Sequence, residues 1–205
     1  MKLLGRVSSL NVRKVLWTCV ELGLEPGRED WGTGFRDVTE PDFVALNPNA
    51  QIPLLIDDGF VLWESNTIIR YLCNAYGGDG IYPADARTRA RVDQWIDWQA
   101  TELNGAWVYA FQACVRKSPL HTDPVLIERS VGQWTRMMTI LDDQLTRTGG
   151  HVAGAGFSLA DIPVGLSVMR WFATPIAHKP LPAVDAYVER LKARPGFAAY
   201  GPGFS

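Results

Sequence analysis

The chain lacks the features that mark membrane, secreted and nucleic-acid-binding proteins. No apolar run is long enough to span a bilayer, and Met1 to Leu10 lack the apolar stretch of a secretory signal. The 20 basic and 22 acidic side chains nearly balance, and no block of like charge occurs. Neither nucleic acid nor an anionic membrane is therefore a favoured partner, and we expect a cytoplasmic protein.

Cysteine is scarce as well. Cys19, Cys73 and Cys114 are odd in number and far apart, which fits neither a disulfide framework nor a zinc site. We expect buried, reduced thiols and no metal centre. What the chain does have is an ordinary globular composition of 47% hydrophobic and 20% charged residues, over a length that suits one large domain or two small ones.

The first part of the chain alternates strand and helix signals. The order, βαβαββα, predicts a mixed α/β domain over residues 1–78. The predicted elements are a strand at 2–4, a helix at 12–22, a weak strand at 28–31, a short helix at 41–46, strands at 53–56 and 60–63 joined by an Asp-Asp-Gly turn, and a helix from 64–65 to 77.

Strand signals stop after the glycine-rich linker at 77–80. Four helices are predicted beyond it, one starting near residue 85 and the others at 124–145, 158–172 and 183–192. Ser158 to Asp161 is a capping sequence with an acidic residue in the third helical position. The pattern predicts an all-α domain over residues 86–205.

Three short motifs contain residues that suit a binding site. The first is Gln51-Ile52-Pro53, between a loop and an apolar strand. A cis bond before Pro53 would leave the backbone N–H and C=O of Ile52 able to pair with an extended peptide. The alternative is an ordinary trans proline at the start of a strand.

The second motif, Glu64-Ser65, opens a helix. Ser65 is a good N-cap residue, and the free N–H groups and dipole of a helix start favour a bound carboxylate. Glu64 can pair with an ammonium group, so the two residues suit the head group of an α-amino acid. The alternative is plain helix capping.

The third motif is Ser8, Ser9 and Asn11, between the first strand and the first helix. Hydroxyl and amide donors beside a helix start stabilise an anion, although a helix cap is again the alternative. No His–Asp pair lies nearby in the sequence, so a nucleophile of the serine-protease type is not supported.

In their order and spacing these motifs resemble the soluble glutathione transferases, most of all the bacterial theta-like enzymes that use a serine. The resemblance covers nearly the whole chain and implies a thioredoxin-like N-terminal domain, an all-α C-terminal domain and a homodimer. It rests on the serine turn, Asn-Pro-Asn-Ala-Gln-Ile-Pro at 47–53, Leu-Trp-Glu-Ser-Asn at 62–66, the glycine linker, the capping sequence at 158–161 and Arg-Pro-Gly-Phe at 194–197.

The resemblance also implies glutathione as co-substrate and assigns residues to it. Ile52, beside a cis Pro53, pairs with the cysteinyl backbone of glutathione. Glu64 and Ser65 hold the γ-glutamyl end, and Gln51 lies near the glycyl carboxylate.

Ser9 is implied to be the catalytic serine, with Ser8 as the alternative, and Asn11 matches a position that binds the thiol in some bacterial relatives. Ala50 stands where the family usually has glycine, a change that should be tolerated unless φ is positive there.

The implied reaction is attack of the glutathione thiolate on a small hydrophobic electrophile. Trp107, Tyr109 and Phe111 are candidates to line its pocket, although aromatic residues on a long helix more often belong to a core or an interface. Two alternatives stay open. One is a glutathione-dependent disulfide reductase or peroxidase with the same site. The other is a non-catalytic glutathione-binding protein on the same scaffold.

Overall fold

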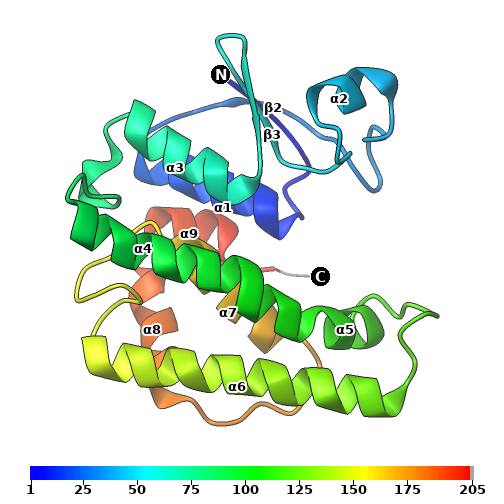
Figure 1. Cartoon of the computed structure of the whole chain (residues 1–205), viewed down its shortest axis with the longest axis vertical. Helices are drawn as coiled ribbons and strands as arrows, with labels where there is room; N and C mark the ends of the chain where they lie inside the picture. Colours follow the sequence, from blue (N-terminus) through cyan, green and yellow to red (C-terminus); the bar gives the residue numbers. More distant parts are fainter. Residues whose placement is uncertain (204–205) are drawn as a thin grey trace.

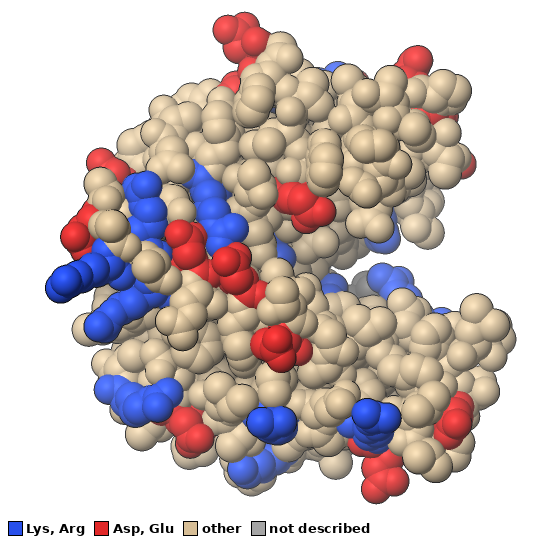
Figure 2. All heavy atoms as spheres, viewed as in Figure 1, with Lys and Arg blue, Asp and Glu red and all other residues tan. Residues whose placement is uncertain are grey.

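The computed structural model describes residues 1–203, which form two layers (Figure 1). The upper layer holds a four-stranded sheet with its helices, and the lower layer is entirely helical. The space-filling view shows the surface hollowed between the layers (Figure 2). The element order of the first layer is the predicted βαβαββα. The domain division at 78 and 86 stays a prediction, and residues 204 and 205 of the predicted helical domain lie outside the described range.

The sheet has the strand order β2-β1-β3-β4. β1 (Lys2–Leu4) pairs in parallel with β2 (Gly27–Glu29) and antiparallel with β3 (Leu54–Asp57). β4 (Phe60–Trp63) pairs antiparallel with β3, as the predicted hairpin requires. This mixed sheet confirms the expected thioredoxin-like arrangement of the first layer.

Both faces of the sheet are covered. Neighbouring residues of a strand point to opposite faces, so Leu3 enters the main core while Leu4 packs on the other side with Phe43 of α2 (Pro41–Leu46). A strand buried on both faces reads as a continuous apolar run, which explains why β3 shows no alternation in the sequence.

Helix α1 (Leu10–Glu21) joins the two layers. It packs against α3 (Ser65–Ala75) beneath the sheet and against α7 (Asp161–Ala173) and α9 (Pro195–Tyr200) of the lower layer. Every residue from Val12 to Cys19 is buried, because α1 has neighbours on all sides.

The remaining helices form the lower layer, and their bounds agree with the predictions to within a few residues. The helix predicted from residue 85 is three consecutive segments, and the short α9 was not predicted as a helix. The three segments are α4 (Ala86–Trp98), a π-helical turn η2 (Gln99–Leu103) and α5 (Asn104–Cys114). The other elements are the short η1 (Gly78–Gly80) before α4, then α6 (Pro124–Thr148) and α8 (Pro182–Lys192).

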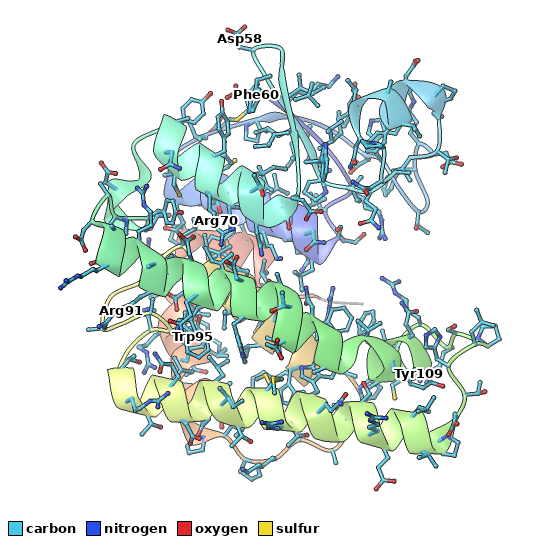
Figure 3. All side chains as sticks on the ribbon, viewed as in Figure 1. Asp58, Phe60, Arg70, Arg91, Trp95 and Tyr109 are labelled. Atoms are coloured by element: carbon cyan, nitrogen blue, oxygen red, sulfur yellow. The ribbon has the colours of Figure 1, made fainter. Side chains whose placement is uncertain are left out.

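An ion-pair cluster ties α3 to α4. Arg70 Nε lies 2.6 Å from Asp93 Oδ1, and its Nη2 lies 2.5 Å from Asp97 Oδ1. Arg70 is labelled in Figure 3, where it lies between the two helices. A forked guanidinium that reaches two carboxylates on successive turns fixes the angle at which the layers meet.

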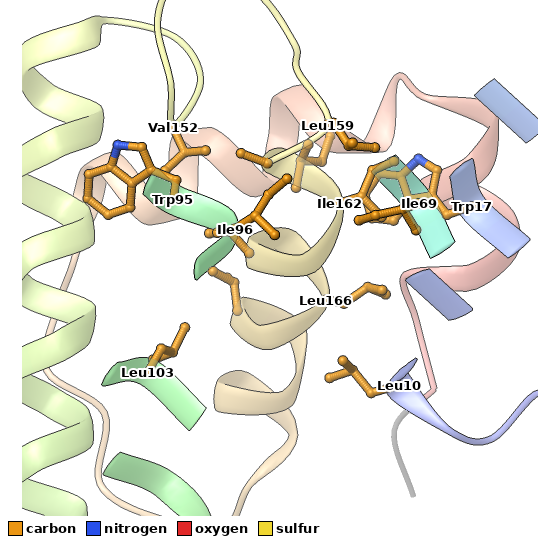
Figure 4. Close-up of a cluster of buried hydrophobic side chains, with 14 of the residues drawn as sticks. Leu10, Trp17, Ile69, Trp95, Ile96, Leu103, Val152, Leu159, Ile162 and Leu166 are labelled. Atoms are coloured by element: carbon orange, nitrogen blue, oxygen red, sulfur yellow. The ribbon is translucent and has the colours of Figure 1, made fainter. Parts of the chain in front are cut away.

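The layers share one hydrophobic core. Trp17 of α1 is fully buried in a cluster with Ile69 of α3 and with Ile162 and Leu166 of α7 (Figure 4). A Cβ atom on Gly196 would lie 2.0 Å from the Trp17 ring, so only glycine fits there. The glycine in the Arg-Pro-Gly-Phe pattern therefore has a packing role.

Helix α7 begins three residues later than predicted, because the capping sequence is itself a turn. Asp161 Oδ2 accepts hydrogen bonds from the backbone N–H of Ser158 at 2.8 Å and from its hydroxyl at 3.0 Å. Asp161 also accepts a bond from the Val152 N–H at 2.9 Å and from the Tyr187 hydroxyl at 3.0 Å. Asp161 is thus the first residue of α7 and not the third, as was predicted.

The three thiols are unpaired, as expected, but they differ in burial. Cys19 and Cys73 are buried, and burial raises the pKa of each to about 12. Cys114 is only half-buried, so that part of the prediction is wrong. It ends α5, where the chain turns toward solvent.

Within residues 1–203, no group of three or more His, Cys, Asp or Glu side chains is placed to hold a metal ion. None of the described helices is long and apolar enough to cross a membrane.

Candidate active site

The residues predicted to hold glutathione all line one hollow at the edge of the sheet, which we call the first pocket. It is formed where the loop before β3 faces the start of α3. Its lining residues are Asn11, Asn47, Asn49, Gln51, Ile52, Pro53, Trp63, Glu64 and Ser65. Residues from three separate parts of the sequence are thus brought together.

Hydrogen bonds within the loop before β3 hold its conformation. The Ile52–Pro53 bond is cis, as predicted. The buried Asn47 donates from Nδ2 to the Gln51 carbonyl at 2.7 Å, and its Oδ1 accepts the Asn49 N–H at 3.1 Å. Ile52 lines the first pocket, and within residues 1–203 its backbone N–H and C=O form no hydrogen bond that would compete with a ligand.

Ala50 lies in this loop with φ of 50°. The alanine was expected to be tolerated unless φ is positive, and φ is positive here, so this position is strained. A left-handed conformation costs an L-residue with a Cβ about 1–2 kcal/mol, which a glycine would avoid.

Ser65 is not the N-cap of α3, so that prediction is wrong. Glu64 takes the N-cap position with φ of 70°, and its side chain makes no capping hydrogen bond. The chain leaves β4 at Trp63 and turns within one residue, so Ser65 already has helical geometry. Backbone strain of this kind costs about 1–3 kcal/mol and concentrates at functional sites. Through Glu64 and Ser65, the start of α3 lines the first pocket.

The serine turn borders a second hollow, the second pocket, of about 260 Å³. Asn11 lines both pockets and therefore marks their junction. The second pocket is lined by Arg6, Ser8, Ser9, Leu10, Asn11, Asn104, Trp107, Val108, Arg116 and Arg170.

The two serines are placed differently within this pocket. Ser9 is the N-cap of α1, but its side chain makes no capping hydrogen bond. Ser8 accepts a hydrogen bond from Arg6 Nη1 at 2.7 Å. The Ser9 hydroxyl therefore lies at a helix start without serving the helix, which is the arrangement expected of a donor to a bound anion.

Of the three aromatic candidates on α5, Trp107 lines the second pocket. Phe111 packs behind it, with ring centroids 5.3 Å apart. Tyr109 makes an edge-on contact with the His121 ring, with ring centroids 4.8 Å apart, and is not part of the pocket lining. The pocket wall is thus less aromatic than the sequence suggests.

The basic residues of the second pocket were not predicted from the sequence. Arg6, Arg116 and Arg170 come from three distant segments, and no spacing in the sequence connects them. Arg6 also lines a neighbouring hollow with Ala50 and Gln51.

A second missed feature is a buried polar network behind the site. Lys14 donates to Asn66 Oδ1 and to Gln99 Oε1, both at 3.0 Å. Gln99 Nε2 donates to Asn104 Oδ1 at 3.1 Å, and the same oxygen accepts Trp107 Nε1 at 3.0 Å. The network runs from α1 through the π-helical turn to the wall of the second pocket.

Burial lowers the pKa of Lys14 to about 7, helped by the charge of Arg170 and opposed by that of Glu64. An unfolded lysine titrates near 10.4, so between these values the unfolded chain binds more protons and stability rises with pH. The burial of Lys14 therefore destabilises the fold by its full amount below about pH 7, and it no longer does so above the pKa of lysine in the unfolded chain.

We therefore expect the free energy of unfolding to rise by roughly 1–2 kcal/mol more in the wild type than in Lys14→Met between pH 7 and pH 8.5. Denaturant unfolding of both proteins at each pH measures this difference, and the variant corrects for all other titrating groups. Parallel pH dependences would show that Lys14 is not perturbed.

Comparison with known proteins places this site in a family. The family model for the glutathione S-transferase N-terminal domain matches residues 8–75. Glutathione S-transferase GstB of Escherichia coli K12 is 32% identical over 93% of this chain and 92% of its own length. The chain belongs to the glutathione S-transferase family. Glutathione S-transferase 3 of Zea mays is 33% identical over 96% of this chain and 91% of its own length.

Solved structures of glutathione S-transferases agree with this assignment. A theta-class enzyme from Xanthomonas axonopodis pv. citri, solved with glutathione bound, superposes with a TM-score of 0.92 and 33% identity, over 100% of this chain and 98% of that one. A delta-class enzyme from Nilaparvata lugens gives a TM-score of 0.87 at 27% identity, over 99% and 95%. The whole described fold is thus that of a glutathione transferase.

Proposed function

We propose that this glutathione transferase binds glutathione in the first pocket and activates its thiol at Ser9 and Asn11 for attack on a small electrophile in the second pocket. The observation that carries the proposal is the position of Asn11, which lines both pockets. A peptide paired with the Ile52 backbone has its sulfur near this junction.

Activation requires no acid–base triad. A free thiol with a pKa near 8.5 is only about 3% ionised at pH 7, whereas a pKa of ~6.5 gives roughly 75% thiolate. The difference is about 2.7 kcal/mol, which a hydroxyl donor, an amide donor and a helix start can supply together. In this mechanism Ser9 stays neutral and donates a hydrogen bond to the sulfur.

The ends of glutathione meet groups of opposite charge or matching polarity. The γ-glutamyl ammonium pairs with Glu64, and its carboxylate accepts bonds from Ser65 and the start of α3. Gln51 donates to the glycyl carboxylate. Glu64 is exposed and its side chain makes no capping hydrogen bond to α3, so its carboxylate is available to pair with a ligand.

Glu64→Gln removes this charge without changing the size of the side chain. We expect the dissociation constant of glutathione to rise about tenfold, the effect of losing one charge-assisted hydrogen bond. Titration calorimetry of wild type and variant measures it, with Glu25→Gln, an exposed position outside both pockets, as the control. Equal affinities for Glu64→Gln and wild type would refute the orientation.

Turnover of glutathione with aryl halides, epoxides, disulfides and hydroperoxides tests the reaction itself. Transfer predicts a thioether product with the first two. Reduction predicts glutathione disulfide or a mixed disulfide with the last two. Glutathione binding with no product in any assay would favour a non-catalytic role.

We also propose a cytoplasmic homodimer, as the family resemblance implies. Phe60 on β4 exposes 50% of its surface, which leaves apolar area for a second copy to cover. Light scattering should give twice the 22.7 kDa of one chain, and a monomer at micromolar concentration would contradict the dimer.

A further inference from the structure

Asn104 lines the second pocket, and its side-chain amide fits the structure in only one orientation. Its Oδ1 accepts hydrogen bonds from Gln99 Nε2 at 3.1 Å and from Trp107 Nε1 at 3.0 Å. The indole N–H of a tryptophan can donate but not accept, so the atom that faces it must be the amide oxygen of Asn104. The Nδ2 group is therefore the end of this amide that the protein leaves over.

The orientation of Gln99 follows from that of Asn104. An acceptor oxygen must face a donor, so Gln99 presents Nε2 to Asn104, and its Oε1 accepts from Lys14 Nζ at 3.0 Å. Gln99 Nε2 also donates to the Ser167 hydroxyl at 2.9 Å, which in turn donates to the Pro163 carbonyl at 2.9 Å. The hydrogen bonds thus run in one direction, from Lys14 through Gln99 to Asn104.

The π-helical turn η2 makes the contact between Gln99 and Asn104 possible. Residues five apart lie on different sides of an α-helix, because an α-helix has about 3.6 residues per turn. In η2 the Asn104 N–H donates to the Gln99 carbonyl five residues earlier, which brings the two side chains within hydrogen-bonding distance. Turns of this kind occur frequently at functional sites.

The Asn104 Nδ2 group forms no hydrogen bond to any other group within residues 1–203. Asn104 is half-buried and lines the second pocket, so its two N–H bonds are available to a molecule bound there. They are also better donors than those of an isolated amide. In a chain of hydrogen bonds that all run in one direction, each bond polarises the next.

We propose that Asn104 is a catalytic residue, whose Nδ2 donates a hydrogen bond to an oxygen of the electrophile on which negative charge develops during attack. This role rests on the proposed function and specifies what the second pocket recognises. It favours electrophiles whose reacting carbon is conjugated to an oxygen, such as α,β-unsaturated ketones. A donor that is held in place before the substrate binds stabilises such a charge without reorganisation.

The reaction with an unsaturated ketone balances without a further reactant. The glutathione thiolate forms a bond to the β-carbon, and the π electrons shift so that the carbonyl oxygen becomes the oxygen of an enolate. Asn104 donates to this oxygen while it is negative. The α-carbon then takes a proton from water, which replaces the thiol proton lost to solvent, and the product is a thioether that keeps the ketone.

The test compares benzylideneacetone with cinnamyl chloride, which has the same phenyl and propenyl groups but no oxygen. In the chloride, the sulfur forms a bond to carbon as chloride leaves with its electron pair, and no charge develops on oxygen. We define the ketone ratio as kcat/KM for the ketone divided by kcat/KM for the chloride, each corrected for its uncatalysed rate. Effects on the thiol or on the size of the pocket act on both compounds, so this ratio isolates the hydrogen bond.

Asn104→Asp is the sharpest variant, because it keeps an oxygen for Gln99 and Trp107 and removes only the donor end of the side chain. Its carboxylate also repels the enolate, so we expect the ketone ratio to fall about 100-fold. Asn104→Leu removes the donor without adding charge and should lower the ratio about tenfold, because water replaces part of the bond at a half-buried position. Most of the loss should lie in kcat, since the charge develops only in the transition state.

Two comparisons complete the design. Asn74→Asp makes the same substitution at an exposed position on α3 that lies outside both pockets, and it should keep the ketone ratio. The pKa of the bound glutathione thiol should move in Ser9→Ala but not in Asn104→Leu, which separates activation of the thiol from stabilisation of the enolate.

The outcomes distinguish this role from the proposed function. An unchanged ketone ratio in Asn104→Asp would overturn the role of Asn104 and leave the transferase function standing. Wild-type turnover of the chloride but not of the ketone would do the same. If Asn104→Leu fails to fold, Asn104→Asp still decides. Turnover of neither compound by folded wild-type protein that binds glutathione would refute both.

Discussion

Replacing Asp161 by alanine is expected to destabilise the protein by about 3–5 kcal/mol, the largest effect on stability that we predict. The carboxylate is completely buried and accepts bonds from the Val152 and Ser158 N–H groups and from the Tyr187 hydroxyl. Burial raises the pKa of Asp161, and these donors oppose the rise. Alanine leaves the Val152 and Ser158 N–H groups without an acceptor in the interior, where each such loss costs about 1–3 kcal/mol, whereas the Tyr187 hydroxyl keeps the backbone carbonyl of residue 161 at 3.2 Å.

Thermal unfolding measures this effect, because a chain of this size loses about 2–4 °C in Tm for each kcal/mol. We expect a decrease of about 10 °C for Asp161→Ala. Asp143→Ala, at an exposed position on α6, is the matched control and should change stability by less than about 0.5 kcal/mol. Similar Tm values for the two variants would show that the buried network contributes little.

Ser9→Ala is expected to lower kcat/KM by about 10–100-fold while glutathione affinity stays nearly unchanged. Losing one donor to a full negative charge costs about 10²–10³ at an oxyanion site, and the helix start reduces the loss here because it also stabilises the thiolate. Since the hydroxyl makes no capping bond, the variant should fold normally. The pH–rate profile should move to higher pH, because the bound thiol then ionises less readily.

Two neighbouring variants make the assignment specific. Asn11→Ala should cause a smaller loss in the same direction. Ser8→Ala should have little effect, because in this structure the Ser8 hydroxyl interacts with Arg6. A shift of the profile in Ser8→Ala alone would move the catalytic assignment to that residue.

The sequence predicted the fold well because its signals are local. A hairpin turn between apolar runs and the helical stripes each depend on a few adjacent residues. The cis bond before Pro53 was implied only by the family resemblance, because the tripeptide alone also fits a trans proline. The errors lie at element ends. Ser65 looked like a cap from its residue type, but the tight turn at Glu64 places it one position inside the helix. The π-helical turn after α4 carries no local sequence signal.

The residues predicted to bind glutathione each belong to a short motif, and the fold brings them together in the first pocket. The positive charge of the second pocket was not predicted from the sequence. Arg116 follows α5 and Arg170 lies on α7, so only the tertiary fold brings them to one pocket, and either one alone reads as an ordinary surface residue. Lys14 was likewise hidden, because a lysine within an amphipathic helix is normally exposed, whereas α1 is enclosed on every side.

The most direct test of the central claim is the ionisation of the bound glutathione thiol. Its thiolate absorbance is titrated against pH in a Cys114→Ser background, where the remaining Cys19 and Cys73 have a pKa of about 12 and stay protonated. We predict an apparent pKa near ~6.5 for the wild type and a clear upward shift in Ser9→Ala. A bound thiol that titrates like free glutathione, near about 8.5, in both proteins would contradict thiolate activation at this site.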